Sequence, residues 1–155
     1  ETNSLAHRTT WLRSDLTVPC EIKRDGERML RVPAREISAL RGEHIPTERA
    51  QVFDMVCRTE AVGRLVIRGA AVVEWDGQQL SLTLVQGGAG RTVRYADVGA
   101  VKSLRVLADT SSLEIFINGG EQVMTTRYYP DPASCGVQME GAQAEIWAMG
   151  ALQIQ

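Results

Sequence analysis

Two carboxylates, Asp109 and Glu114, stand close together around a short run of hydroxyl residues. Glycoside cleavage needs such a pair, one as the acid and one as the nucleophile or base, about 5 Å apart in retaining enzymes. In an extended chain, however, an odd separation places two side chains on opposite faces. The segment Thr110-Ser111-Ser112 is instead typical of a turn in which the Asp109 carboxylate accepts backbone N–H bonds. We therefore predict structural roles for both carboxylates.

The chain offers few other groups for catalysis or metal binding. His7 and His44 are candidate bases, but no Gly-x-Ser-x-Gly nucleophile elbow accompanies them. Cys20, Cys57 and Cys135 lie tens of residues apart without a Cys-x-x-Cys spacing, so neither a metal site nor a disulfide framework is expected. Their apolar, strand-like surroundings favour buried free thiols in a reducing compartment, and hence a cytoplasmic protein. We expect no metal and no cofactor.

Two further features are candidate binding sites. Trp11, Trp75 and Trp147 could stack on sugar rings, but they lie in strand-like segments, where packing in a core or an interface is the commoner role. The loop Gly87-Gly88-Ala89-Gly90 has the glycines of a phosphate cradle but lacks the Gly-Lys-Ser/Thr that would follow them. We interpret it as a plain loop.

The composition is that of an ordinary soluble globular domain. At 155 residues the chain is long enough for one core and too short for two ordinary ones. The formal net charge is -2, and arginines stand singly among apolar residues, as in the segment 64–68, which is typical of solvated strand edges. A nucleic-acid surface would need clustered cations, and a membrane span about 20 apolar residues in a row. Neither partner is expected.

Period-two alternation recurs along the chain and predicts an all-β protein. The segment 80–84 alternates leucine with serine or threonine, which gives one dry face and one wet face. Asp25-Gly26, Asp76-Gly77 and Asn118-Gly119 separate pairs of strand-like segments, and such dipeptides suit the positive φ angles of hairpin turns. We predict a two-sheet antiparallel β-sandwich, concanavalin-like or jelly-roll-like.

Helical spacing is sustained almost nowhere in the chain. The segment 34–41, after Pro33, is about two turns long and reads as a connector. The polar residues 1–10 are interpreted as a tail, either a linker or a tag remnant, and residues 11–155 as a single sandwich domain. Because the chain starts at Glu1 without an initiator Met or a signal-like segment, we expect a fragment of a longer protein.

The segment 104–121 carries a specific pattern. It resembles the signature Asp-x-Ser-x-x-Glu-x-Phe-x-Asn-x-Gly-Glu near the C-terminus of glycoside hydrolase family 32, the group of invertases, levanases and sucrose-6-phosphate hydrolases. Gly119-Gly120 supplies the glycine of the signature. The other residues that fall on it are Asp109, Ser111, Glu114, Phe116, Asn118 and Glu121.

Two further blocks are similar to the same family and occur in the expected order. The first begins at Trp11, continues through Leu16-Thr17-Val18-Pro19-Cys20-Glu21-Ile22 and an Arg-Asp-Gly hairpin, and ends in the stretch 33–41. It departs from the family pattern at Cys20, where the family usually has arginine. The second block is Met124-Thr125-Thr126-Arg127-Tyr128-Tyr129-Pro130.

The resemblance implies what this chain lacks as well as what it is. In family 32 the signature belongs to an accessory β-sandwich that follows a catalytic five-bladed propeller. The family's catalytic motifs are Asn-Asp-Pro, Arg-Asp-Pro and Glu-Cys. In this chain Asp131-Pro132 follows Pro130 rather than arginine, and Cys20-Glu21 has the reverse order. We therefore assign no catalytic residues here and treat the signature residues as structural.

The expected function is that of a non-catalytic accessory domain of a bacterial β-fructosidase. Its partner would be the propeller of the same polypeptide, which it would support. An apolar face near Trp11 and the segment 16–22 would contact that propeller and could form a weak homodimer. The alternatives are a free-standing carbohydrate-binding or lectin-like sandwich and, third, an unrelated protein-interaction sandwich. An exposed aromatic platform would favour the carbohydrate-binding alternative.

Overall fold

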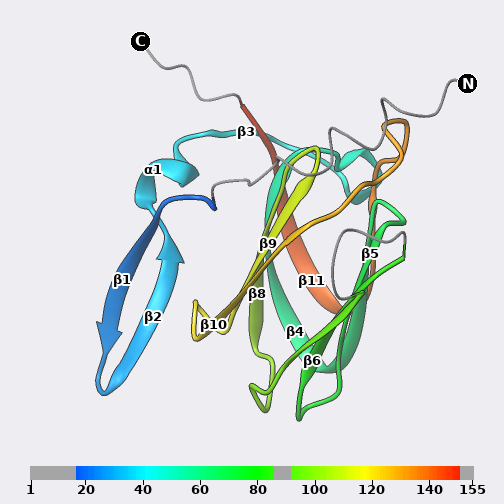
Figure 1. The fold of residues 1–155 in the computed structure, drawn as a ribbon. Helices are drawn as coiled ribbons and strands as arrows, with labels where there is room; N and C mark the ends of the chain where they lie inside the picture. The colour runs from blue at the N-terminus through cyan, green and yellow to red at the C-terminus, as the bar shows by residue number, and fades with distance from the viewer. Residues whose placement is uncertain (1–16, 86–91, 151–155) are drawn as a thin grey trace, which may run out of the picture.

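The computed structural model describes residues 17–85 and 92–150 (Figure 1). The predicted tail, Trp11, His7 and the glycine loop at 87–90 lie outside these residues. The elements in chain order are β1 (Cys20–Asp25), β2 (Arg28–Pro33), α1 (Arg35–Ser38), β3 (Arg41–His44), the 3-10 turn η1 (Thr47–Arg49), β4 (Phe53–Ile67), β5 (Ala71–Trp75), β6 (Leu80–Leu84), β7 (Val93–Ala96), β8 (Ser103–Ala108), β9 (Ser112–Ile117), β10 (Gln122–Arg127) and β11 (Val137–Met149).

The all-β antiparallel sandwich predicted from the sequence is confirmed. Within the described residues, nine strands form one antiparallel sheet in the order β10-β9-β8-β4-β5-β6-β7, with β11 paired to both β4 and β3. The first part of β4, residues 53–58, pairs with β8, and its last part, residues 63–67, pairs with β5. The two layers are therefore joined through the long strands β4 and β11, rather than being separate sheets. The connector predicted at 34–41 contains the short helix α1.

The long strands bend from one layer to the other where two glycines meet. The pairing of β11 with β4 shifts register between Glu140 and Ala142, and Gly141 there has a φ of +66°. Opposite, Gly63 lies against the ring of Trp75, and a Cβ on it would overlap that ring. Glycine lets the backbones approach closely at this bulge, so the sheet can fold onto itself.

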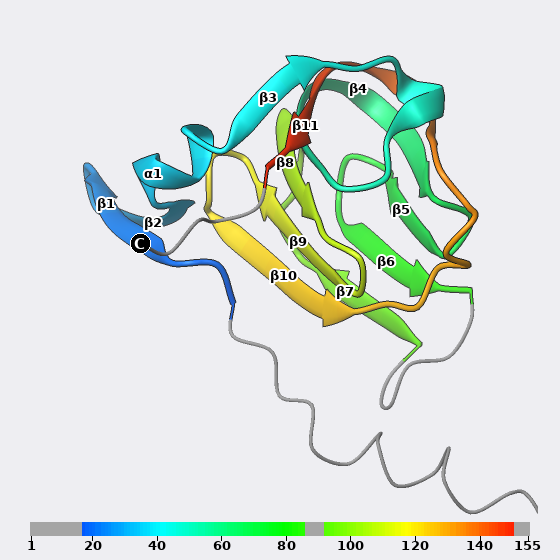
Figure 2. The ribbon, with the colours of Figure 1, turned by 90° about the horizontal axis from the view of Figure 1, so that it is seen from above.

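The core lies between the two layers. Figure 2 shows the sheet curling so that β9 and β10 face β5 and β6. The alternation predicted for 80–84 is confirmed, because the three leucines are buried and the residues between them are half-buried. Trp75 is also buried in the core, and its indole N–H donates to the Glu60 carbonyl at 2.9 Å. The turn between β5 and β6 is longer than the predicted two-residue hairpin, since Trp75 pairs with Leu80. The Asp76 carboxylate stabilises this longer turn by accepting the N–H groups of Gln78 and Gln79.

The other two predicted turns connect strands as expected. Asp25 ends β1 and Gly26 has a φ of +62°, and Asn118 and Gly119 both have positive φ between β9 and β10. On the far side of the sandwich, β7 and β10 come together. The Arg94 guanidinium on β7 donates to the Thr125 carbonyl on β10 at 2.6 Å. This bond links the two ends of the strand order.

The hairpin β1–β2 forms a separate two-stranded sheet beside the sandwich (Figure 1). It is attached at Gly120, whose carbonyl accepts the Arg31 N–H at 2.9 Å. A second apolar cluster, centred on Ile37, Leu107 and Phe116, packs the base of the hairpin and α1 against the outer face of β8 and β9. The N-terminal part of the described chain therefore covers one end of this outer face.

Two predictions about single residues are wrong. Cys57 is buried, and burial raises the pKa of its thiol to about 12, but Cys135 is exposed. Arg68 is not a solvated edge residue: it is 4% exposed, and its guanidinium donates to the carbonyls of Ser134 and Asp131 at 3.0 and 3.3 Å. The loop that follows β10 folds back over Arg68, and sequence alternation does not reveal such a contact.

A carboxylate pocket beside the signature hairpin

The first signature residue, Asp109, stabilises the turn between β8 and β9. Its carboxylate accepts the Thr110 N–H at 2.7 Å, and its own N–H donates to the Ser112 carbonyl at 2.9 Å. The buried Tyr128 donates its hydroxyl to the Asp109 carbonyl at 3.1 Å. These contacts agree with the predicted turn.

The side chain of Asn118 stabilises the turn after β9. Its φ of +51° is one that asparagine tolerates better than most residues. The side-chain Oδ1 accepts the Lys102 N–H at 2.7 Å, and Nδ2 donates to the Ala100 carbonyl at 2.9 Å. Asn118 therefore ties this turn to the chain that enters β8.

The remaining signature residues lie around the same strands. Phe116 is buried in the second apolar cluster, and the Ser111 hydroxyl accepts a bond from Arg127 at 3.2 Å. Glu121 is 3.9 Å from Arg28 in an exposed ion pair, which contributes little to stability.

Glu114 is the signature residue with the least ordinary environment. It lies on the outer face of β9 and is only 4% exposed. Its Oε1 accepts the Val18 N–H at 2.7 Å, while its Oε2 is buried without a hydrogen-bond partner among the described residues. Burial raises the pKa of this carboxyl, and the Val18 hydrogen bond and the charge of Arg31 oppose the rise.

A cavity of about 510 Å³ brings the two candidate carboxylates together, because Asp109 and Glu114 both line it. Much of the remaining wall is apolar, including Ile37, Leu40 and Leu107. The carboxylates are not equivalent, since Asp109 is exposed and bonded within its turn whereas Glu114 is buried and bonded to a distant backbone N–H. Two carboxylates in these environments are suited to accept hydrogen bonds from a bound group. They are less suited to act as the acid and the nucleophile that cleave a glycosidic bond.

A second charged cluster, which was not predicted from the sequence, lies on the same outer face. Asp54 is fully buried on β4, and Arg105 on β8 donates to it twice, at 3.0 and 2.7 Å. Arg41 on β3 donates to the same carboxylate at 2.7 Å. Arg105 also donates to the Ser38 hydroxyl at 3.1 Å, which connects α1 to the sheet. The available signal was one aspartate inside the apolar run 52–57.

Trp147 belongs to this cluster rather than to the core. The Arg41 guanidinium lies 3.8 Å from the centre of its ring, and the His44 ring lies 4.8 Å away. Such a cation–π contact stabilises the cluster and occupies a face on which a sugar would stack. Trp75 is buried, so it offers no platform to a sugar.

The described residues contain neither a cluster of metal ligands nor a helix that could span a membrane. No group of three or more histidine, cysteine, aspartate or glutamate side chains there is arranged to hold a metal ion. No helix in the same ranges is both long and apolar enough to cross a membrane.

We expect Asp109→Ala to lower the free energy of unfolding by about 1 kcal/mol, because the turn loses an acceptor for a backbone N–H. Urea denaturation of the chain measures the change. Asp97→Ala is the matched control, since this exposed carboxylate has no partner among the described residues. Equal effects of the two substitutions would contradict the structural role of Asp109.

Known proteins resemble this chain in both sequence and fold. Residues 76–150 match the family described as "Glycosyl hydrolases family 32 C terminal". The sucrose-6-phosphate hydrolase of Salmonella typhimurium is 34% identical over 141 residues, which cover 83% of this chain and 27% of that protein. The sucrose-6-phosphate hydrolase of Bacillus subtilis is 25% identical over 138 residues, 77% of this chain and 29% of that protein.

The fold comparison agrees with the sequence comparison. The structure of sucrose-6-phosphate hydrolase from Lactobacillus gasseri superposes with a TM-score of 0.73 at 17% identity, over 84% of this chain and 33% of that one. The chain thus spans about a third or less of these relatives. On this evidence it belongs to glycoside hydrolase family 32 and corresponds to the C-terminal domain of that family.

Proposed function

We propose that this domain is a non-catalytic accessory part of a bacterial β-fructosidase that hydrolyses sucrose or sucrose 6-phosphate. The observation that carries the proposal is the match to curated sucrose-6-phosphate hydrolases, of which this chain spans 27% and 29%. The relatives are therefore much longer proteins, and the catalytic groups of this one belong to the polypeptide outside the chain described above.

The chemistry of the described residues supports a structural role. Neither carboxylate of the pocket is freely available, because Glu114 is buried and Asp109 is engaged in its turn. The Asp54 carboxylate is fully buried and bonded to two arginines. A glycosidase needs two accessible carboxyl groups on opposite sides of the scissile bond.

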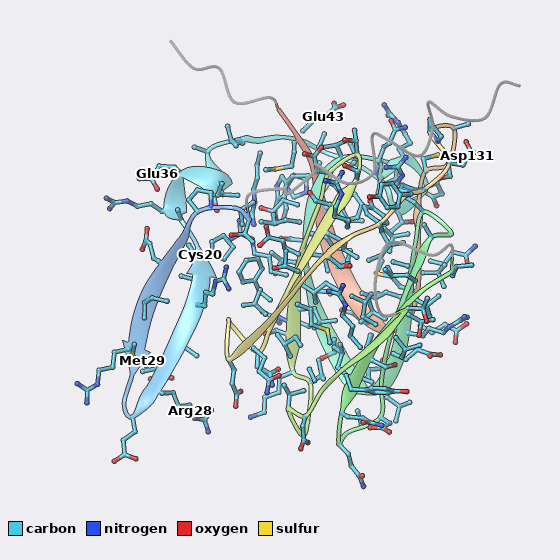
Figure 3. The ribbon with its side chains drawn as sticks, viewed as in Figure 1. Cys20, Arg28, Met29, Glu36, Glu43 and Asp131 are labelled. Atoms are coloured by element: carbon cyan, nitrogen blue, oxygen red, sulfur yellow. The ribbon has the colours of Figure 1, made fainter. Side chains whose placement is uncertain are left out.

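The hairpin β1–β2 is our candidate contact surface for the rest of the enzyme. Ile22 and Met29 are 60% and 66% exposed on it. Figure 3 places Met29 near the free end of the hairpin, away from the sandwich, and Cys20 at its base. A two-stranded hairpin is marginally stable by itself, so a neighbouring domain against these side chains would stabilise it. This surface includes part of the 16–22 segment predicted to be apolar and exposed.

Several predictions accompany this proposal. We propose residues 11–155 as one accessory domain and residues 1–10 as a linker or tag remnant. A weak homodimer through the hairpin surface and a cytoplasmic location stay predictions.

We expect the chain alone to release no fructose from sucrose or sucrose 6-phosphate above the rate in buffer. The physical reason is that the two carboxylates of the pocket are engaged elsewhere, because Glu114 is buried and bonded to the Val18 N–H and Asp109 is bonded within its turn. A coupled assay for released hexose measures this, with the longer polypeptide encoded by the upstream reading frame as the positive control. Turnover by the chain itself that disappears in Glu114→Gln would assign catalysis to the pocket and refute the proposal.

A further inference from the structure

The cavity beside the signature hairpin has an unmet requirement for a hydrogen-bond donor. Glu114 lines this cavity of about 510 Å³ and is 4% exposed. Its Oε1 accepts the Val18 N–H at 2.7 Å, whereas no donor in the described part of the chain reaches its buried Oε2. A buried carboxylate oxygen without a donor is costly, and native proteins usually supply one.

The charge of the cavity wall favours a cation as that donor. Asp109 adds a second carboxylate, and no lysine, arginine or histidine is among the described residues that line the cavity. The charge of Arg31 lowers the pKa of Glu114 less than burial raises it, and Arg31 is not part of the lining. Buried negative charge beside apolar surface is best compensated by a cationic donor that enters the cavity.

The shape of the cavity fits a small ligand with an apolar stem. Its walls come from five segments that are separate in the sequence, among them α1, the β8–β9 turn and the end of β11. Ile37, Leu40 and Leu107 supply apolar surface. A cavity with walls on several sides accommodates one stem and one head group better than an extended peptide. Its volume is within the range of small-molecule sites, roughly 300 to 1,000 Å³.

A guanidinium is the head group that best matches Glu114. It presents several donors in one plane, stays charged when it is buried and is more weakly hydrated than an ammonium. The last torsion of a glutamate side chain is broad, so a small rotation of the carboxylate can present Oε2 to a bound donor.

We infer that this cavity is a binding site for a small alkylguanidinium, with the head group on Oε2 of Glu114 and the alkyl stem against α1 and β8. A neutral ligand of the same shape would leave the buried charge uncompensated. The inference rests on the described residues of this chain alone and does not depend on the proposed enzymatic role of the longer protein.

Titration of the full 155-residue chain with n-butylguanidinium tests the site. We expect saturable binding in isothermal calorimetry. Binding of n-butylurea, which has the same shape without the charge, should be at least about tenfold weaker. Glu114→Gln should weaken the binding of n-butylguanidinium by a similar factor, because it removes the buried charge. Glu43→Gln is the matched control and should change the affinity less than about twofold, since Glu43 is exposed on β3 and does not line the cavity.

Carboxyl-carbon NMR gives a second readout, which also serves if Glu114→Gln does not fold. The pKa of Glu114 should fall by about 1 at saturating n-butylguanidinium, because a neighbouring cation favours the ionised carboxylate. n-Butylurea should leave this pKa unchanged.

Three results would overturn the inference: no saturable binding, equal affinity for n-butylurea, or a pKa of Glu114 that does not respond to the ligand. A peptide control separates a small ligand from a protein segment. If acetyl-Gly-Arg-Gly-amide binds as tightly as n-butylguanidinium, the cavity is a docking site for a protein segment and the inference of a small ligand is wrong.

Discussion

Asp54→Asn should lower the free energy of unfolding by about 3 kcal/mol, because it removes the buried charge that compensates two arginines. Asp54 is fully buried, and it accepts one hydrogen bond from Arg41 and two from Arg105. Asparagine keeps the shape of the side chain but leaves both guanidinium groups without a countercharge. Urea denaturation monitored by tryptophan fluorescence measures the change.

The matched control is the exposed ion pair between Arg64 and Glu74, also formed across neighbouring strands. Nε of Arg64 lies 3.3 Å from Oε1 of Glu74, and the two side chains are 48% and 53% exposed. Glu74→Gln should change the free energy of unfolding by less than about 0.5 kcal/mol, since water screens an exposed pair. If Asp54→Asn costs no more than Glu74→Gln, the buried cluster does not stabilise the fold.

Gly63→Ala should destabilise the protein by about 3 kcal/mol, at the upper end of the usual cost of overpacking a core. A Cβ at this position would overlap the Trp75 ring and lie 2.6 Å from the Glu140 carbonyl oxygen. The Trp75 indole cannot move freely, because it is buried and bonded to the Glu60 carbonyl. The substitution therefore forces the two long strands apart where they bend, and a thermal or urea transition would report the loss.

Gly150→Ala is the matched control for this position. A Cβ there would meet its nearest neighbour, the Leu40 carbonyl oxygen, at the ordinary distance of 3.6 Å. We expect a change within about 0.5 kcal/mol. The penalty of Gly63→Ala should also shrink in a Trp75→Leu background, where the smaller side chain leaves space. A penalty that is the same in both backgrounds would show that the clash with Trp75 is not the cause.

Local structure could be predicted from the sequence because its causes are local. The alternation at 80–84 creates a strand with one buried face whatever it packs against. Asn118 and Gly119 tolerate positive φ, so the reversal after β9 is encoded in two adjacent residues. The signature residues were also sufficient to predict the family, which the comparisons confirm.

Part of the site was predictable in the same way. The turn at Asp109 depends on its immediate neighbours Thr110 and Ser112, and the sequence predicted it. For Glu114 the sequence predicted a structural role but not the partner. That partner is the Val18 N–H, 96 residues away along the chain.

The sequence by itself determined the alternation of the strands, the turns at Gly26 and at Asn118-Gly119, and membership of the family. Only the tertiary structure decided how the layers join at Gly63, which charges are buried, and that Asp109 and Glu114 share one cavity. Alternation says which residues share a face of one strand, but not what covers that face. In this protein the outer face of β8 and β9 is covered by segments that are distant in the sequence, namely α1 and the base of the β1–β2 hairpin. The environment of the side chains on that face therefore depends on long-range packing.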